Sequence, residues 1–147
     1  MTPGPNAIKL IKEFEGCRLT AYPDPASGGD PWTIGYGATG AGITKGTVWT
    51  QAHADARLTS DLCRFAAIIS RFITNTNTTQ NQFDAMMSFA YNLGAGSLEH
   101  STLLRDHNAG NYDAAKGQFA LWDKAGGQVM SGLSRRRTAE ASIYGLD

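Results

Sequence analysis

The segment Phe14-Glu15-Gly16-Cys17-Arg18-Leu19-Thr20-Ala21-Tyr22-Pro23-Asp24, followed by Trp32-Thr33-Ile34-Gly35-Tyr36-Gly37, carries the clearest signal in the chain. It places one carboxylate, Glu15, at the end of a helix-like run and a second, Asp24, in a turn. Thr33 follows in a short strand-like run. Two carboxylates in unlike surroundings can divide an acid role and a base role between them. The segment therefore predicts a site for acid–base chemistry.

The composition limits the classes of protein that could carry this site. A chain of 147 residues with 41% hydrophobic and 18% charged residues is an ordinary globular protein that can bury one core. Its 13 basic residues balance its 13 acidic ones, so no net field favours nucleic acid or an anionic membrane. The residues Met1–Asn6 lack the basic and apolar parts of a signal peptide, and no run of about 18 apolar residues occurs. We therefore expect a protein made without a signal.

The spacing of apolar residues predicts most of the helices. Asn6 can cap a first helix that stops at Gly16. A helix of about twenty residues follows from Thr50, and its apolar residues step by three and four: Leu58, Leu62, Phe65 and Ile69. Thr79 and Gln82 form a capping box for a helix that ends near Gly94. Further helices are expected at 102–108, after Asn111 as a cap, and at 135–144 after Ser134 as a cap. Expected core residues are Phe83, Met86, Met87, Ala90, Ala115, Phe119 and Trp122.

Turn-forming residues at 23–31 lie between the β-like runs 19–22 and 32–36, which predicts a hairpin with an extended loop. The expected fold is α+β and mostly helical, a single domain over 1–147. Its β-containing lobe covers about 15–50, a connecting helix covers about 50–72, and a helical lobe covers about 79–147 together with the N-terminal helix. A cleft between lobes is the usual place for a polymeric substrate.

Several other sequence patterns give weaker evidence of function. Gly35-x-Gly37-x-x-Gly40 matches a dinucleotide fingerprint, but no helix opens at these glycines and Asp55 lies inside a helical pattern, so we reject it. Cys17 and Cys63 form no disulfide framework or metal motif; reduced, partly buried thiols are favoured and a single bridge stays open.

Charged and titratable side chains elsewhere give no second site. Arg135-Arg136-Arg137, with Glu140 one turn from Arg136, predicts a partly self-paired, solvated helix face rather than a nucleic-acid patch. The scattered residues His53, His100 and His107 are expected to be surface histidines.

The acid–base segment meets the needs of a glycosidase. Such an enzyme needs one protonated carboxyl to protonate the leaving oxygen and one ionised carboxyl to activate water or stabilise positive charge. The helix C-terminus and apolar neighbours favour a protonated Glu15. Asp24, between two prolines in a Gly-rich turn, is expected to stay hydrated and charged, and Thr33 could fix the water by a hydrogen bond.

The segment Phe14–Asp24 together with Trp32–Gly37 resembles the phage-type lysozymes, or endolysins, of glycoside hydrolase family 24. The resemblance continues through further motifs in the same order: Phe83-Asp84-Ala85, Phe89–Gly94, Ser101–Leu104 and Gly132-Leu133-x-x-Arg136-Arg137-x-x-Glu140. It thus covers nearly the whole chain. The chain departs from the family in two places: eight residues separate Asp24 from Thr33 where a shorter loop is common, and Ala38 stands where many relatives carry His.

The resemblance implies a lysozyme-like two-lobe fold and a role for each site residue. Glu15 is the general acid, Asp24 the base or electrostatic stabiliser, and Thr33 the residue that orients the water. Tyr91, Asn92 and Ser101 line the saccharide cleft, and Arg136 is a cation beside the catalytic Glu. No metal or organic cofactor is implied. Sequence alone leaves inversion and retention open, and the resemblance suggests inversion.

The implied activity is that of a muramidase, which hydrolyses the β-1,4 bond between N-acetylmuramic acid and N-acetylglucosamine in peptidoglycan. The expected partner is bacterial peptidoglycan, with no nucleic acid and no membrane insertion, for a monomer that stays in the host cytoplasm until a holin opens the membrane. Two alternatives stay open: a lytic transglycosylase, and a non-catalytic peptidoglycan-binding protein on the same fold.

Overall fold

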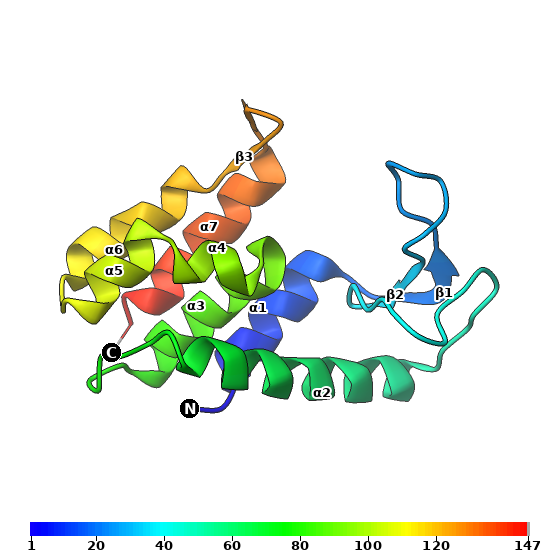
Figure 1. The fold of residues 1–147 in the computed structure, drawn as a ribbon, viewed down its shortest axis with the longest axis horizontal. Coiled ribbons are helices and arrows are strands. Elements are labelled where there is room, and N and C mark those ends of the chain that lie inside the picture. The colour runs from blue at the N-terminus through cyan, green and yellow to red at the C-terminus, as the bar shows by residue number, and fades with distance from the viewer. Residues whose placement is uncertain (147) are drawn as a thin grey trace. The chain divides into compact units, whose positions relative to one another are not determined.

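Helices dominate the structure, a computed structural model that describes residues 1–146 (Figure 1). The chain divides into two units. The first contains Met1–Leu10 and the chain from Cys63 onward, and the second is Ile11–Leu62. Helices α1 (Pro5–Glu15) and α2 (Gln51–Ser70) each contribute residues to both units. The predicted α+β, mostly helical class is confirmed.

The first unit is built from short helices and one small hairpin. In chain order these are α3 (Gln80–Leu93), α4 (Ala95–Glu99), α5 (Thr102–Asn108), α6 (Tyr112–Gln118), a 3-10 turn (Phe119–Leu121), β3 (Lys124–Ala125), β4 (Gln128–Val129) and α7 (Ser131–Tyr144). The strands β3 and β4 pair antiparallel.

Helix α3 is the centre of this unit, since every residue from 82 to 90 is buried. A helix that is buried on all sides carries apolar residues all round, as this one largely does. Phe89 packs edge-on against Phe119, with ring centroids 5.9 Å apart, and against Trp122 at 5.2 Å. The expected core is confirmed, although Trp122 is only half-buried: Phe83, Met86, Met87, Ala90, Ala115 and Phe119 are all buried.

The capping box at the start of α3 is confirmed, because the Thr79 side chain accepts from the Gln82 N–H and the Gln82 side chain accepts from the Thr79 N–H. Two other predicted caps are wrong. Helix α1 begins at Pro5, which suits a first helical position, so Asn6 lies inside it. Helix α7 begins at Ser131, so Ser134 lies within its first turn. Helix α4 and the β3–β4 hairpin carried no clear sequence signal.

The second unit contains a hairpin and its small core. Strand β1 (Arg18–Tyr22) pairs antiparallel with β2 (Thr33–Gly35), with Arg18 opposite Gly35 and Tyr22 opposite Thr33. A register irregularity between Arg18 and Tyr22 accommodates the longer strand. Beneath the hairpin, a core cluster unites apolar side chains from separate segments: Ala21, Ile34, Ala38 and Ile43, with Trp32 and Trp49 packed against it.

Ala38, which the resemblance marks as a departure from the family, is part of that core. Ala38 is buried, and its N–H and C=O both bond to the backbone of Ile34, at 2.8 and 2.9 Å. Main-chain hydrogen bonds and apolar packing therefore close this turn without a polar side chain. No helix opens at Gly35–Gly40, in agreement with the rejection of the dinucleotide motif.

One histidine contradicts the prediction of surface residues. His53 and His100 are exposed, but His107 is 0% exposed. Thr78 Oγ1 donates to the Asn75 carbonyl at 2.6 Å, so it accepts from His107 Nε2 at 2.8 Å; His107 Nδ1 then accepts from the Tyr144 hydroxyl at 2.6 Å. This arrangement needs a neutral imidazole. Burial lowers the pKa of His107 to about 4 and raises the pKa of Tyr144 above its usual range.

The buried neutral histidine predicts acid-sensitive stability. Because the pKa of His107 is about 4 in the folded chain and about 6.5 when unfolded, protons bind the unfolded chain first as pH falls. Stability from this residue is complete above about pH 6.5 and is lost between pH 6.5 and 4. We expect the melting temperature of the parent to fall more steeply across this window than that of His107→Asn, measured by calorimetry. His100→Asn, at an exposed site, is the control and should follow the parent; parallel curves for parent and His107→Asn would contradict the assignment.

Candidate active site

Glu15 is the last residue of α1, and Gly16 ends the helix. Gly16 has φ +67°, a left-handed conformation that residues other than glycine adopt at a cost, and its N–H bonds to the Lys12 carbonyl at 3.2 Å. The helix therefore stops where the sequence predicted. Glu15 is half-buried at this terminus.

Asp24 lies at the start of the loop that joins β1 to β2. Its main chain closes the loop, because its N–H donates to the Gly29 carbonyl at 2.9 Å and its carbonyl accepts from the Gly28 N–H at 2.8 Å. Gly28 has φ +72°, which the tight return requires. The side chain of Asp24 is half-buried and forms no hydrogen bond or ion pair with the residues that the structure describes. Its carboxylate is therefore available to water or a ligand.

Thr33 opens β2 and is half-buried opposite Tyr22. Its hydroxyl donates to the Pro31 carbonyl at 3.2 Å. With its proton engaged there, the Thr33 oxygen keeps its lone pairs to accept a hydrogen bond. Thr33 is thus suited to accept from a water molecule.

A polar cluster that the sequence did not predict links three segments of the second unit. Asp55 Oδ1, on α2, accepts from the Tyr36 hydroxyl at 3.1 Å and from Gln51 Nε2 at 3.0 Å, and lies 3.4 Å from Lys12 Nζ. Lys12 precedes Glu15 by one turn on α1, and Tyr36 follows β2. The cluster therefore fixes the end of the helix that carries Glu15 against the strand that carries Thr33.

Ionisation in this cluster follows from its hydrogen bonds. The Gln51 hydrogen bond is the main cause that lowers the pKa of Asp55, and Tyr36 and Lys12 act in the same direction. Burial, with the hydrogen bond to Asp55, raises the pKa of Tyr36. The spacing of Gln51 and Asp55, four apart on a helix, was a signal that could have revealed the pair.

The candidate substrate-binding residues lie in the first unit, on and after α3. Tyr91 is half-buried, with its ring 5.5 Å from that of Phe65. Asn92 is half-buried, and its Oδ1 atom is buried without a hydrogen-bond partner in the described chain. Ser101 is buried and caps α5, because its Oγ accepts from the Leu104 N–H at 3.0 Å and donates to the Leu98 carbonyl at 2.7 Å. A helix cap is therefore one role of Ser101.

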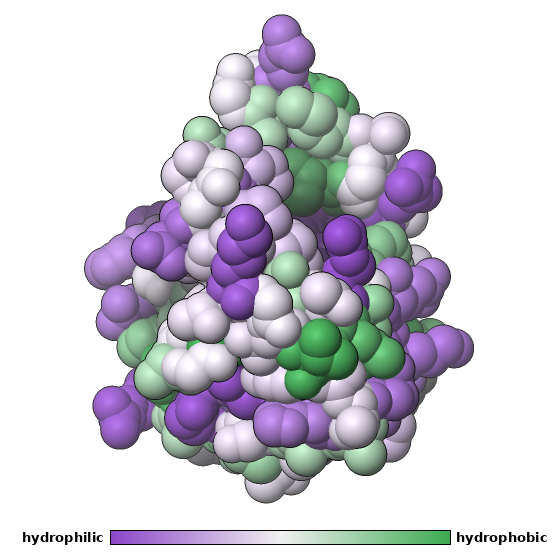
Figure 2. All heavy atoms as spheres, turned by 90° about the vertical axis from the view of Figure 1, so that its right-hand side faces the viewer, coloured by the Kyte–Doolittle hydropathy of each residue, from purple (hydrophilic) through white to green (hydrophobic). Residues whose placement is uncertain are grey.

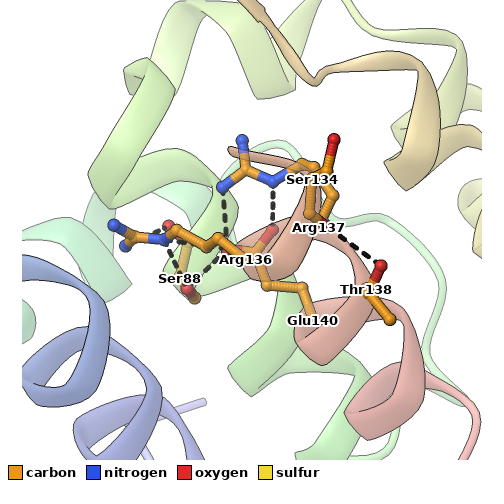
Figure 3. Close-up of polar contacts among 6 residues, drawn as sticks. All are labelled: Ser88, Ser134, Arg136, Arg137, Thr138 and Glu140. Atoms are coloured by element: carbon orange, nitrogen blue, oxygen red, sulfur yellow. Dashed lines mark hydrogen bonds and ion pairs between the residues drawn. The ribbon is translucent and has the colours of Figure 1, made fainter. Parts of the chain in front are cut away.

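Arg136 belongs to a buried charge cluster, which corrects the prediction of a solvated helix face. Arg136, Arg137 and Glu140 are at most 3% exposed. Figure 3 shows both guanidinium groups and Ser88, from α3, beside the Glu140 carboxylate. Arg137 Nε lies 2.6 Å from Oε1 and Arg136 Nε 3.3 Å from Oε2.

Glu140 is held by more than its two arginines. The Ser88 hydroxyl donates to Oε2 at 2.5 Å, and Arg136 Nη2 also donates to the Ser88 carbonyl at 3.1 Å. Burial raises the pKa of Glu140, and Arg137 is the main opposing influence. The cluster ties α7 to α3. Only Arg135 of the three arginines is exposed.

The cysteines and the other possible metal ligands form no further site in the described chain. Cys17 and Cys63 are both free; Cys17 is half-buried as predicted, but Cys63 is exposed, so the prediction of a partly buried thiol is wrong for Cys63. Within residues 1–146, no three His, Cys, Asp or Glu side chains are grouped so as to hold a metal ion. No helix in the same residues is long and apolar enough to cross a membrane. Figure 2 shows one face of the molecule, on which hydrophilic residues and residues of intermediate hydropathy surround separate hydrophobic patches.

Comparison with known proteins places the chain among lysozymes. Its structure matches the muramidase domain of SpmX from Asticaccaulis excentricus with a TM-score of 0.88 at 34% identity, over 98% of this chain and 97% of that one. The predicted lysozyme-like fold is therefore confirmed.

The model of the phage lysozyme family matches residues 12–140, and the chain belongs to that family. It is 40% identical to the endolysin of Bacillus phage B103 over 93% of this chain and 51% of that protein. It is 39% identical to the endolysin of Salmonella phage P22 over 92% of this chain and 93% of that protein. The chain thus spans about half the length of the first relative and nearly all of the second.

The buried cluster around Glu140 gives a stability prediction. Glu140→Gln keeps the side-chain volume but leaves two buried arginines without a carboxylate, which should lower the free energy of unfolding by about 3–5 kcal/mol. Urea denaturation followed by circular dichroism measures it. Arg135→Ala, an exposed change on the same helix, should stay within about 0.5 kcal/mol of the parent. A Glu140→Gln protein as stable as Arg135→Ala would contradict the role of the cluster.

Proposed function

We propose that the chain is a peptidoglycan hydrolase that cleaves the β-1,4 bond between N-acetylmuramic acid and N-acetylglucosamine. The observation that carries the proposal is its membership of the phage lysozyme family together with Glu15, Asp24 and Thr33 in one unit. A half-buried helix-end carboxyl, an unpaired loop carboxylate and a hydroxyl oxygen with free lone pairs are the three groups that such hydrolysis needs.

Each residue has one step in the proposed reaction. Glu15, in its acid form, gives its proton to the glycosidic oxygen as the bond from that oxygen to the anomeric carbon breaks. A water molecule, donating one hydrogen bond to Thr33 Oγ1, attacks the anomeric carbon from the opposite face. Asp24 accepts the second proton of the water and stabilises the positive charge that develops on the sugar. This course inverts the anomeric carbon.

Residues of the first unit support substrate binding in the proposal. Tyr91 offers a partly exposed ring to a sugar, and Asn92 has a buried amide oxygen without a hydrogen-bond partner in the described chain. Ser101 combines its capping role with a place in the wall of a groove of about 500 Å³, which Arg71 and Arg105 also line. Arg136, which is paired with Glu140 on α7, has a supporting role in the proposal.

The proposed partner is bacterial peptidoglycan, bound by a monomer without nucleic acid, membrane insertion or a cofactor. In this proposal the protein remains in the host cytoplasm until another protein opens the membrane.

Glu15→Gln tests the general acid. The amide cannot donate the proton that the leaving oxygen needs, so we expect release of reducing ends from purified peptidoglycan to fall about a hundredfold or more. Glu13→Gln, a nearby exposed glutamate on α1, is the matched control and should keep the parent rate. Unchanged circular dichroism shows that both variants fold. Activity of Glu15→Gln within about tenfold of the parent, or about 1.4 kcal/mol of barrier, would end the assignment.

Product analysis separates the remaining alternatives. Mass spectrometry of the parent digest should give hydrated muramic acid ends that incorporate one oxygen from labelled water. Anhydro-muramic ends would identify a lytic transglycosylase, which acts without water. Tight binding to peptidoglycan with no new ends would identify a non-catalytic binding protein.

A further inference from the structure

Arg18 and Tyr22, at the two ends of β1, form a stacked pair on the hairpin. The Arg18 guanidinium carbon lies 4.7 Å from the centroid of the Tyr22 ring. Arg18 is exposed and Tyr22 is half-buried. A guanidinium that rests on an aromatic face keeps the N–H donors at its edge free while losing much of its freedom to move.

The pair stands next to the candidate catalytic residues. Tyr22 is the cross-strand partner of Thr33, and side chains of directly opposed residues project from the same face of a hairpin. Tyr22 also precedes Asp24 by two residues. The charge of Arg18 is therefore held one aromatic ring away from the hydroxyl proposed to orient water.

Arg18 differs from the structural arginines in having no anion. Arg57 contacts Asp61 at 2.9 Å and donates to the Thr39 carbonyl, and Arg136 and Arg137 share Glu140. Among residues 1–146, the Arg18 side chain makes no salt bridge and no hydrogen bond; its partner is the Tyr22 ring. A fixed fork of N–H donors without a carboxylate is suited to take one from a ligand.

We propose that Arg18, held in place by Tyr22, binds a free carboxylate of the peptidoglycan stem peptide and thereby contributes to substrate selection. This inference rests on the proposed function, and it names a substrate contact that hydrolysis of the glycan alone does not require. The sugars of the glycan carry no charge when their lactyl groups are amide-linked to peptide. In peptidoglycan freed of teichoic acid, the stem peptides supply the carboxylates.

The contact is tested by a double-mutant-type cycle in which Arg18 and the carboxyl groups of the substrate are changed separately and together. The substrates are teichoic-acid-free peptidoglycan and the same material with its carboxyl groups converted to amides by carbodiimide and ammonia. We expect kcat/KM of the parent to fall about tenfold on amidation, and kcat/KM of Arg18→Ala to be about tenfold lower on native material with no further fall on amidation. An equal effect of amidation on both proteins would overturn the proposal, because Arg18 would then act on something other than a carboxylate of the substrate.

One control variant sharpens the result. Lys45→Ala removes one exposed charge from the same unit and should respond to amidation as the parent does, which excludes a net-charge effect.

Failure of this inference is distinguishable from failure of the proposed function. If the proposed function is wrong, the parent releases no reducing ends from either substrate. If only the Arg18 contact is wrong, the parent and Arg18→Ala hydrolyse both substrates with the same ratio of rates.

Discussion

The register of β1 against β2 is the constraint on which the candidate site depends. With Tyr22 opposite Thr33, the Thr33 hydroxyl, the Tyr22 ring and the stacked Arg18 share one face. A slip of one residue would turn Thr33 to the other face, because side chains alternate along a strand. Ile34 resists that slip, since its side chain is fully buried in the core cluster beneath the hairpin. Apolar packing on one face thus fixes the polar residues on the other.

Two acidic residues show how burial changes the meaning of an ion pair. Asp55 is about half exposed, and water screens its contact with Lys12, so hydrogen bonds from Tyr36 and Gln51 do most to hold it. Glu140 is fully buried, and water cannot replace a lost partner there. Removal of one charge is then costly, because the others stay behind in a poorly solvating interior. The first arrangement orients a helix end, and the second joins two helices.

The sequence was most informative where local chemistry decides structure. The capping box of Thr79 and Gln82, the stop at Gly16 and the hairpin around Asp24 all depend on nearby residues, and all were predicted. The errors arose where distant packing decides. Arg136, Arg137 and Glu140 have the spacing of a solvated helix face, and only contact with Ser88 on α3 shows them to be buried. His107 lies four residues after Leu103 and therefore on the same face of its helix. Its place on this apolar face could have indicated that it is buried. The roles of Glu15, Asp24 and Thr33 stay predictions.

The long loop between Asp24 and Thr33 need not displace the residues at its ends. Asp24 bonds through its main chain to Gly28 and Gly29, and Ser27 Oγ donates to the Asp30 carbonyl at 2.7 Å, so the inserted residues fold back on themselves. Extra length in a loop closed in this way adds little strain at its base, because the entropy of loop closure rises only slowly with length. Strand pairing then sets where Thr33 stands, whatever the loop contains. An insertion here can change the tip of the loop while the hairpin register that positions Thr33 is kept.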